Sequence, residues 1–431
     1  WLHEGSLSDT LIERSFNLGI FMQAPVDKLP PPPQGAPLQL LRGVHVLDLT
    51  TSIAAPYATM LMADLGAEVV KIERPRSGDD SRAWGPPFLD GESLWYLSVN
   101  RNKASVTLDY ASESGLEVLR ALVRVADVIV LNVVERVQKK LRIDYETLRA
   151  IKPDLVFVSL TGFGSGGARS DLPAYDLTAE GYSGVMDITG EPDSPPQKIG
   201  TPAADLLSGM DAVIGALAAL FDRARTGQGH KVDVSMVESM ARFLTPRIVT
   251  YLGSGEVPRR SGARDSVIAV YQAFETADLP ITLGLGNNNL WKRFWVAVGD
   301  PEFAEDPRLL TSAQRHAHRA EIIDRIQALL RTKSRAHWLE LLHTARIPAG
   351  PINRVDEIAE DPHLVERGFL FKMLREGLQI PQVGLGIRFD GVANTPRTPP
   401  PMLGADTRAI LSSWARIDAS RLDELQSEGV I

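Results

Sequence analysis

Two apolar runs joined by a helix-forming segment constrain the fold of this chain more than any other feature. Residues 44–49 (VHVLDL) and 67–73 (AEVVKIE) have the pattern of strands. Residues 56–65 (PYATMLMADL) lie between them, open with a helix-starting proline and end at Gly66. A strand, a helix and a strand in this order form a right-handed βαβ unit with parallel strands. The sequence therefore predicts an α/β fold with a Rossmann-like, doubly wound large domain.

The same alternation continues along the chain. Further strands are predicted at 104–110, 127–131, 155–160 and 231–235, with helices at 112–125, at 145–150 and from 236. The turn after the first strand, residues 50–55 (TTSIAA), lacks the G-x-G-x-x-G pattern that cradles a pyrophosphate. Gly284-Leu285-Gly286-Asn287 fails the same test. The predicted domain is therefore not expected to bind NAD.

The 431 residues are enough for two domains. We expect an N-terminal arm at 1–40, which contains an extended polyproline spacer at 29–33, and the first part of the large domain at 41–250. A Gly-, Pro-, Arg- and Ser-rich linker at 251–266 leads to a smaller α+β domain at 267–345. A return linker beginning near 346 and the C-terminal part of the large domain complete the chain to 431. In the small domain we expect strands at 269–276 and 281–285, a Trp-rich helix from 290, and helices at 319–330 and 336–344.

Composition excludes several classes of function. The net charge of −8, with acidic and basic residues interspersed, argues against nucleic acid as a partner. We expect no membrane span, because no window resembles a long uninterrupted apolar segment. The chain has no cysteine, which excludes disulfides, thiolate nucleophiles and Cys-based metal sites. A reducing cytoplasm, or a mitochondrial matrix in a eukaryote, suits such a chain.

Residues 199–221 (IGTPAADLLSGMDAVIGALAALF) are predicted to form a helix that carries Asp205 in its first turn. The predicted buried stripe consists of Leu206, Met210, Val213, Ile214, Leu217, Leu220 and Phe221. Asp205 is expected at the N-cap, where backbone N–H groups and the helix dipole keep it ionised and ready to act as a nucleophile. The alternative is a purely structural cap that contributes about 1 kcal/mol.

Other catalytic patterns are absent from the sequence. It contains no G-x-S-x-G, P-loop or H-E-x-x-H motif. The candidates that remain are carboxylates, a glycine-rich turn at 161–167 that follows a strand, and basic residues near strand ends. These basic residues are Lys71, Arg74, Arg101, Lys103, Lys139 and Lys140.

Several long motifs resemble the class III CoA-transferase family, the CaiB/BaiF group that includes formyl-CoA transferase and crotonobetainyl-CoA transferase. They are GAEVVKIERP followed by GDD, SVNRNK, AYDLTAEGYSG and RTGQG, and the similarity covers residues 41–375. The resemblance implies an interlocked homodimer in which both ends of each chain build a large domain. It also places the family's nucleophilic aspartate on Asp205.

The implied reaction is CoA transfer between small carboxylic or dicarboxylic acids through an aspartyl anhydride and an aspartyl-CoA thioester. CoA thioesters are then substrates, and no permanent cofactor or metal is expected. By the same resemblance, Arg74, Lys140, Leu108 and Lys103 are expected to bind CoA. Tyr175 and Asp176 are expected to line the acyl site, and Gly162 and Gly164 to supply N–H donors for an oxyanion.

The chain departs from the family pattern in ways that bear on substrate. Residues 131–136 (LNVVER) replace the usual E-N-F-x-P-G, Ala55 replaces the glycine of A-G-P, and Ala168 replaces a proline. A glycine-rich flap is not visible near 261–266, which favours a dicarboxylate such as succinate over oxalate.

Two alternatives stay open at this stage. The first is an α-methylacyl-CoA racemase or epimerase, in which relatives carry a histidine where this chain has Tyr175, a weaker base at neutral pH. The second is a CoA-binding paralogue without catalysis, motivated by the altered loop at 131–136.

Overall fold

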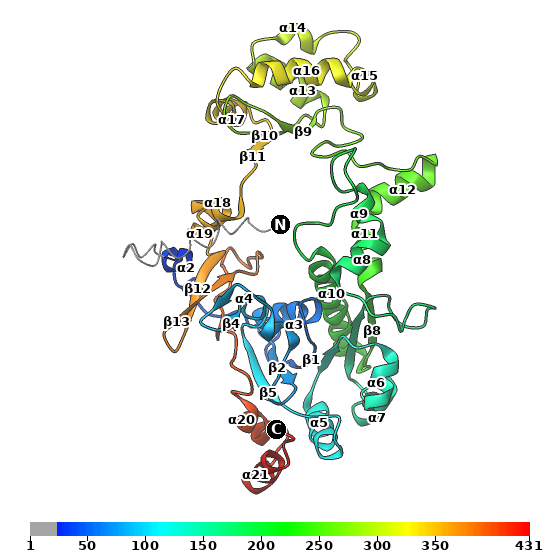
Figure 1. Cartoon of the computed structure of the whole chain (residues 1–431), viewed down its shortest axis with the longest axis vertical. Helices are drawn as coiled ribbons and strands as arrows, with labels where there is room; N and C mark the ends of the chain where they lie inside the picture. The colour runs from blue at the N-terminus through cyan, green and yellow to red at the C-terminus, as the bar shows by residue number, and fades with distance from the viewer. Residues whose placement is uncertain (1–23) are drawn as a thin grey trace, which may run out of the picture.

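The computed structural model describes residues 24–431. Within this range, six parallel strands form one central sheet in the order β5-β2-β1-β6-β7-β8 (Figure 1). Counted along the chain this order is 3-2-1-4-5-6, which is that of doubly wound sheets and reverses direction between β1 and β6. The predicted parallel α/β sheet is confirmed. Its strands are β1 (His45–Leu49), β2 (Glu68–Glu73), β5 (Lys103–Thr107), β6 (Val128–Leu131), β7 (Val156–Thr161) and β8 (Lys231–Ser235).

Helices cover both faces of the sheet. Val46 and Val128 belong to one buried cluster, and their neighbours Leu47 and Ile129 belong to another, as the two-residue period of a strand requires. The first cluster contains α3 (Ala54–Asp64), α8 (Asp176–Ser183), α9 (Val185–Ile188), α10 (Ala203–Thr226) and α11 (Met236–Phe243). The second contains α5 (Glu113–Val125), α7 (Tyr145–Ile151), α20 (Thr407–Ser413) and α21 (Ala419–Ser427). Burial on both faces explains why the strands are almost continuously apolar.

The buried face of α10 differs from the predicted stripe. Met210, Ile214 and Phe221 are 40%, 60% and 68% exposed, so the prediction is wrong for them, although Val213 is buried. The buried face consists mainly of small residues: Ala203, Ala204, Ser208, Gly209, Ala212, Ala216 and Ala219. The reason is the close approach of α3, since a Cβ on Gly209 would lie 2.5 Å from the carbonyl oxygen of Ala54.

Among the described residues, α10 is also a helix long and apolar enough to cross a membrane. The expectation that the chain contains no such segment is therefore wrong. The helix contacts α3, α8, α11, β7 and β8, and it carries Asp205, Asp211 and Arg223. Its apolar character follows from this central position in the folded chain.

A third hydrophobic cluster is built only from residues of the 270–347 segment. It includes the strands β9 (Tyr271–Phe274) and β10 (Ile281–Gly284), which form an antiparallel sheet with β11 (Ala349–Pro351). The helices are α13 (Asn288–Ala297), α14 (Pro301–Ala304), α15 (Ser312–Ala317), α16 (Arg319–Leu330) and α17 (Arg335–Thr344). These elements lie at the upper end of the molecule in Figure 1.

Both predicted linkers contain regular structure. Residues 251–254, expected to begin the first linker, form the last turn of α12 (Thr245–Ser254). Residues 349–351, expected in the return linker, form the strand β11. The two connecting segments run along opposite sides of the molecule in Figure 1.

The C-terminal part returns to the central sheet. It first forms α18 (Val355–Ala359), α19 (Pro362–Glu366) and a hairpin of β12 (Leu370–Arg375) and β13 (Leu378–Val383). Asp406 then accepts the N–H of Ser105 at 2.9 Å, and Thr407 accepts the N–H of Thr107 at 3.0 Å. The last helices are thereby fixed to the edge strand β5.

The first 23 residues of the predicted arm lie outside the described residues. From Ala24 onward the arm packs against the body of the same chain: α2 (Pro25–Lys28) precedes an extended segment, and Pro30 accepts the N–H of Lys372 at 2.9 Å. The remaining short elements are η1 (Asp80–Ala83), β3 (Phe88–Leu89), β4 (Glu92–Ser93), α4 (Leu94–Ser98) and α6 (Glu135–Leu141).

Candidate active site

A cavity of about 320 Å³ lies at the carboxyl ends of β1, β6 and β7. This is the point where the strand order reverses, and ligands of open α/β sheets bind there. Its walls include Thr51 and Ser52 after β1, Asn132 after β6, and Gly162 after β7. The starts of α3, α8, α10 and α11 reach the same cavity at Ala54, Tyr175, Asp205 and Met236. Helix starts present N–H groups and positive dipole ends, which suit a ligand that carries negative charge.

Asp205 lines this cavity, but it does not cap its helix. It is the third residue of α10, and Pro202 occupies the N-cap, so the predicted N-cap position is wrong. The acceptor for the helix start comes from another helix instead. Asp176, the first residue of α8, accepts the N–H of Ala204 at 2.8 Å and that of Asp205 at 3.4 Å. The Asp205 carboxyl is therefore left for the cavity.

The electrostatics of Asp205 also differ from the expectation. Burial raises the pKa of Asp205 to about 7, and the charge of Asp176 acts in the same direction. We expected backbone N–H groups at the helix start to bind the Asp205 side chain and keep it ionised near neutral pH. The N–H groups of Ala204 and Asp205 are donated to Asp176 instead. Asp205 is therefore a much weaker acid than an ordinary aspartate.

The loop after β1 is held on two sides. Thr51 donates its N–H to Asn132 at 3.1 Å, and the Asn132 amide donates to the Thr51 carbonyl at 2.8 Å. Ser52, a non-glycine residue with a φ of 72°, donates its N–H to Asp79 at 3.0 Å. These bonds maintain an unfavourable left-handed backbone conformation at the cavity wall.

A network of buried charged residues contacts the backbone at the start of this loop. Lys71 lies 2.8 Å from Asp79 and donates to the Thr50 carbonyl at 2.8 Å. Lys103 donates to Asp48 at 3.0 Å, and burial lowers the pKa of Lys103 to about 8. Although burial opposes it, Lys103 and Lys71 lower the pKa of Asp48 to about 2. Lys103, predicted to bind CoA, is thus occupied within this network and does not line the cavity of Asp205.

The other predicted CoA residues are dispersed. Arg74 lines an adjacent cavity of about 250 Å³ and pairs with Asp80, which lines both cavities. Leu108 is fully buried in the hydrophobic cluster that contains α5. Lys140 is exposed on α6 and lines neither cavity. Of these residues, the structure brings only Arg74 next to the cavity of Asp205.

The predicted acyl-site residues are brought together more closely. Tyr175 lines the cavity and is 66% exposed, and Gly162 lines it from the end of β7. Gly162 is fixed by packing, because a Cβ there would lie 2.3 Å from that of Ala174. The N–H of Gly164 is donated to Thr161 at 3.1 Å and that of Ser165 to Asp233 at 2.9 Å. In the described structure the N–H of Gly164, one of the two expected oxyanion donors, is thus already bonded within the turn.

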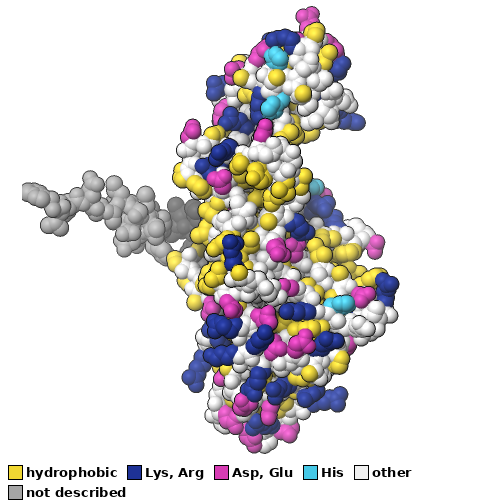
Figure 2. Space-filling view, turned by 90° about the vertical axis from the view of Figure 1, so that its right-hand side faces the viewer, with side chains coloured by type: hydrophobic (Ala, Val, Ile, Leu, Met, Phe, Trp, Pro, Cys, Tyr) yellow, Lys and Arg dark blue, Asp and Glu magenta, His cyan; other side chains and the backbone are white. Residues whose placement is uncertain are grey.

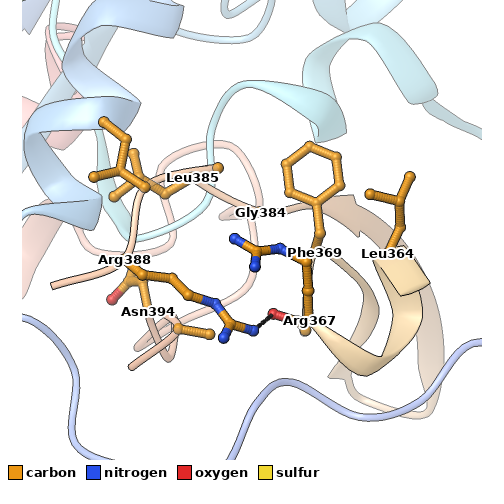
Figure 3. A pocket seen from close by; sticks show the side chains of 11 residues that line it. Leu364, Arg367, Phe369, Gly384, Leu385, Arg388 and Asn394 are labelled. Atoms are coloured by element: carbon orange, nitrogen blue, oxygen red, sulfur yellow. Dashed lines mark hydrogen bonds between the residues drawn. The ribbon is translucent and has the colours of Figure 1, made fainter. Parts of the chain in front are cut away.

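Another cavity, of about 270 Å³, lies between residues 364–369 and 384–394 (Figure 3). In it the Arg388 guanidinium donates to the Arg367 carbonyl at 2.5 Å. None of the residues predicted to be catalytic lines this cavity. Within residues 24–431, no group of three or more His, Asp or Glu side chains is arranged to hold a metal ion.

Several residues at the site were not predicted from the sequence. Asn132 and Asp79 hold the loop after β1, and Glu180 accepts the N–H of Ile199 at 2.9 Å. Asn132 follows a strand directly, which is the position where ligand-binding residues of parallel sheets gather. Asp79 and Glu180 act over long sequence separations and gave no local signal.

The model of CoA-transferase family III matches residues 41–407. A succinyl-CoA:glutarate CoA-transferase of Mus musculus is 35% identical over 392 residues, covering 91% of this chain and 90% of that protein. A succinate–glutarate CoA-transferase of Agrobacterium fabrum is 36% identical over 385 residues, covering 88% and 96%. The crystal structure of a CaiB/BaiF family protein from Brucella suis matches with a TM-score of 0.75 and 35% identity, covering 88% of this chain and all of that one.

Proposed function

The chain belongs to CoA-transferase family III and is an acyl-CoA:carboxylate CoA-transferase, and we propose that it exchanges CoA between short dicarboxylic acids through covalent intermediates on Asp205. The observation that carries this proposal is the placement of a carboxyl with a pKa of about 7 in the cavity at the strand reversal. Its helix start is capped by Asp176, so the Asp205 oxygens are available to a substrate.

The proposed exchange begins when a carboxylate oxygen of Asp205 attacks the thioester carbonyl. The carbon–sulfur bond breaks, CoA leaves as a thiolate, and an acyl-aspartyl anhydride remains. The thiolate then attacks the aspartyl carbonyl, which releases the first acid with one aspartyl oxygen and leaves an aspartyl-CoA thioester. The acceptor carboxylate reverses both steps and restores Asp205. Covalent catalysis of this kind divides one difficult exchange into easier steps.

The two adjoining cavities are available for the two parts of an acyl-CoA substrate. We place the acyl group beside Asp205 and the CoA moiety toward Arg74, since a guanidinium is well suited to a phosphate oxygen. Asp80 pairs with Arg74 in the described structure, so a CoA phosphate has to compete with Asp80 for this cation. Lys103 and Leu108 have buried structural roles and Lys140 is solvent-exposed, so the CoA proposal rests on Arg74.

Succinate and glutarate are the proposed acids, because they occur in the names of two relatives that this chain matches along about nine tenths of its length. Among residues 24–431, the side chains that line the cavity of Asp205 include no Lys or Arg. The distal carboxylate of such an acid therefore depends on N–H and hydroxyl donors here, or on a residue from a second chain.

We also propose a homodimer, interlocked as the family resemblance implies. Figure 2 shows hydrophobic side chains gathered across the middle of the face on which α8, α11 and α12 lie in Figure 1. On α11 and α12, Phe243, Val249 and Leu252 are 54%, 60% and 74% exposed. An exposed apolar surface of this kind marks a protein interface.

Mass spectrometry of the Asp205 peptide tests the covalent route. The protein is incubated with succinyl-CoA, glutaryl-CoA, acetyl-CoA or oxalyl-CoA and quenched with hydroxylamine, which converts an aspartyl thioester into a hydroxamate. We expect the hydroxamate at Asp205 with succinyl-CoA and glutaryl-CoA, and none in the D205N variant. Absence of the adduct, together with deuterium uptake at the acyl α-carbon, would instead identify a racemase.

A further inference from the structure

Glu180 is a buried carboxyl that the exchange steps do not use. It lies on α8 four residues after Asp176, which places both carboxyls on the same side of this helix. Its side chain is fully buried, and Oε2 accepts the N–H of Ile199 at 2.9 Å. Among residues 24–431, Oε1 is also buried and has no hydrogen-bond partner.

The surroundings of Glu180 favour its neutral form. Burial raises the pKa of Glu180 and the charge of Asp176 raises it further, while the Ile199 N–H and the charge of Lys198 oppose the shift. Asp176 lies one helical turn before Glu180 on α8.

The two carboxyls hold both ends of the segment that presents Asp205. Glu180 binds the N–H of Ile199 at the start of this segment, and Asp176 binds the N–H groups of Ala204 and Asp205 at its end. Pro202, at the N-cap of α10, has no side chain that accepts a hydrogen bond. Residues 199–205 thus depend on α8 for their position relative to the cavity.

We propose that Glu180 is a positioning residue for the nucleophile: from its buried place on α8 it binds the Ile199 N–H while Asp176 of the same helix binds the N–H groups of Ala204 and Asp205, and the two together fix residues 199–205. The inference rests on the proposed function in taking Asp205 as the nucleophile. Displacing a reacting group by about 1 Å costs up to ~100-fold in rate, so this support acts on kcat. It leaves CoA binding near Arg74 unchanged.

The test compares E180Q with E180L in the full-length protein. The side-chain amide that E180Q introduces keeps the shape of Glu180 and an oxygen that accepts the Ile199 N–H, whereas E180L removes the acceptor. We expect E180Q to keep kcat within about threefold, and E180L to lose about 10- to 100-fold in kcat with the KM for succinyl-CoA unchanged. The rate of hydroxamate formation at Asp205 should fall in parallel in E180L.

D406L provides a matched control. Asp406 also accepts one backbone N–H at 2.9 Å across a long sequence separation, but it lies at the edge strand β5, away from Asp205. D406L should lower the unfolding temperature as E180L does and leave kcat unchanged. Equal losses of kcat in E180L and D406L, or a wild-type kcat in E180L, would overturn the positioning role of Glu180. Neither result would affect the proposal that Asp205 is the nucleophile. A wild-type protein that forms no adduct at Asp205 would overturn both proposals.

Discussion

Asp176 accepts the backbone N–H of Asp205 at 3.4 Å and, through its charge, helps to raise the pKa of the Asp205 side chain. One carboxylate therefore has two effects on the nucleophile. It supplies the hydrogen-bond acceptor that Pro202, at the N-cap of α10, lacks. Its charge also makes the Asp205 carboxylate more basic than an ordinary aspartate. Greater basicity strengthens a carboxylate as a nucleophile.

The pH dependence of the reaction follows from this pair. The ionised form of Asp205 attacks the thioester, so kcat/KM for the donor should rise with pH and level off above its pKa of about 7. In D176N the amide oxygen still accepts the helix N–H groups, but the negative charge is gone. The inflection should then move to lower pH, because one cause of the raised pKa is removed. Steady-state rates measured from pH 5 to 9 give the pH of this inflection. An inflection at the same pH in D176N and wild type would contradict the effect of the Asp176 charge on the pKa of Asp205.

The raised pKa of Asp205 should also make the stability of the fold depend on pH. Stability should fall as pH rises, whereas the rate should increase. The folded state binds the Asp205 proton more tightly than the unfolded chain, so Asp205 destabilises the fold increasingly as pH rises from about 4 to about 7. D205N removes this effect and should be more stable than wild type by about 4 kcal/mol at pH 8, with little gain at pH 4. Urea unfolding at the two pH values measures the difference. A D205N variant that is equally stable or less stable at pH 8 would contradict the buried, weakly acidic carboxyl.

Arg74 and Lys140 were both expected to bind CoA, but the structure places only Arg74 beside the cavity of Asp205. Arg74 lines the cavity beside that of Asp205, whereas Lys140 is exposed on α6 and lines neither cavity. R74A should raise the KM for succinyl-CoA about 10- to 100-fold by removing a charged hydrogen bond, with a smaller effect on kcat. K140A, the matched loss of a cation, should leave both unchanged. A larger KM effect in K140A would relocate the CoA site.

The close packing of α10 on α3 gives a prediction about stability. A methyl group at Gly209 would lie 2.5 Å from the Ala54 carbonyl, so G209A should push the two helices apart and destabilise the fold by about 1–3 kcal/mol. Gly253, on α12, has no neighbour within 4 Å of such a methyl group. G253A is therefore the control and should stabilise by about 0.5–1 kcal/mol through helix propensity. Denaturant unfolding of both variants distinguishes packing from a general effect of glycine replacement.

The elements of the large sheet could be predicted because their signals are local. The strands predicted at 44–49, 67–73 and 231–235 are found at 45–49, 68–73 and 231–235, and Ser112 caps α5 at the start of the helix predicted for 112–125. The buried face of α10 could not be predicted in the same way. Hydrophobicity favours Ile214 and Phe221 as core residues, whereas the distance between α10 and α3 selects Gly209 and small neighbours.

The place of Asp205 in the candidate site could be predicted from the sequence, but the residues that hold it there could not. Asp205 was found from its place at the start of an apolar helix and from the family resemblance. The residue that caps this helix is Asp176, 28 positions away from Ala204, so the capping expectation for Asp205 failed. Glu180 and Asp79 likewise bind backbone groups 19 and 27 positions away, so their supporting roles could not be predicted from local sequence. Their roles depend on contacts that only the folded chain creates.

The oxygen content of Asp205 after turnover tests the central claim most directly. The protein is allowed to turn over succinyl-CoA with glutarate whose carboxylates carry heavy oxygen, and the peptide containing Asp205 is then weighed. In the proposed route each acceptor leaves one oxygen on the aspartate, which departs with the next released acid. We predict heavy oxygen in the Asp205 side chain and, in later turnovers, in the released succinate. Glutaryl-CoA formation without label in Asp205 would contradict the account and would mean that CoA passes between the acids without a covalent bond to this residue.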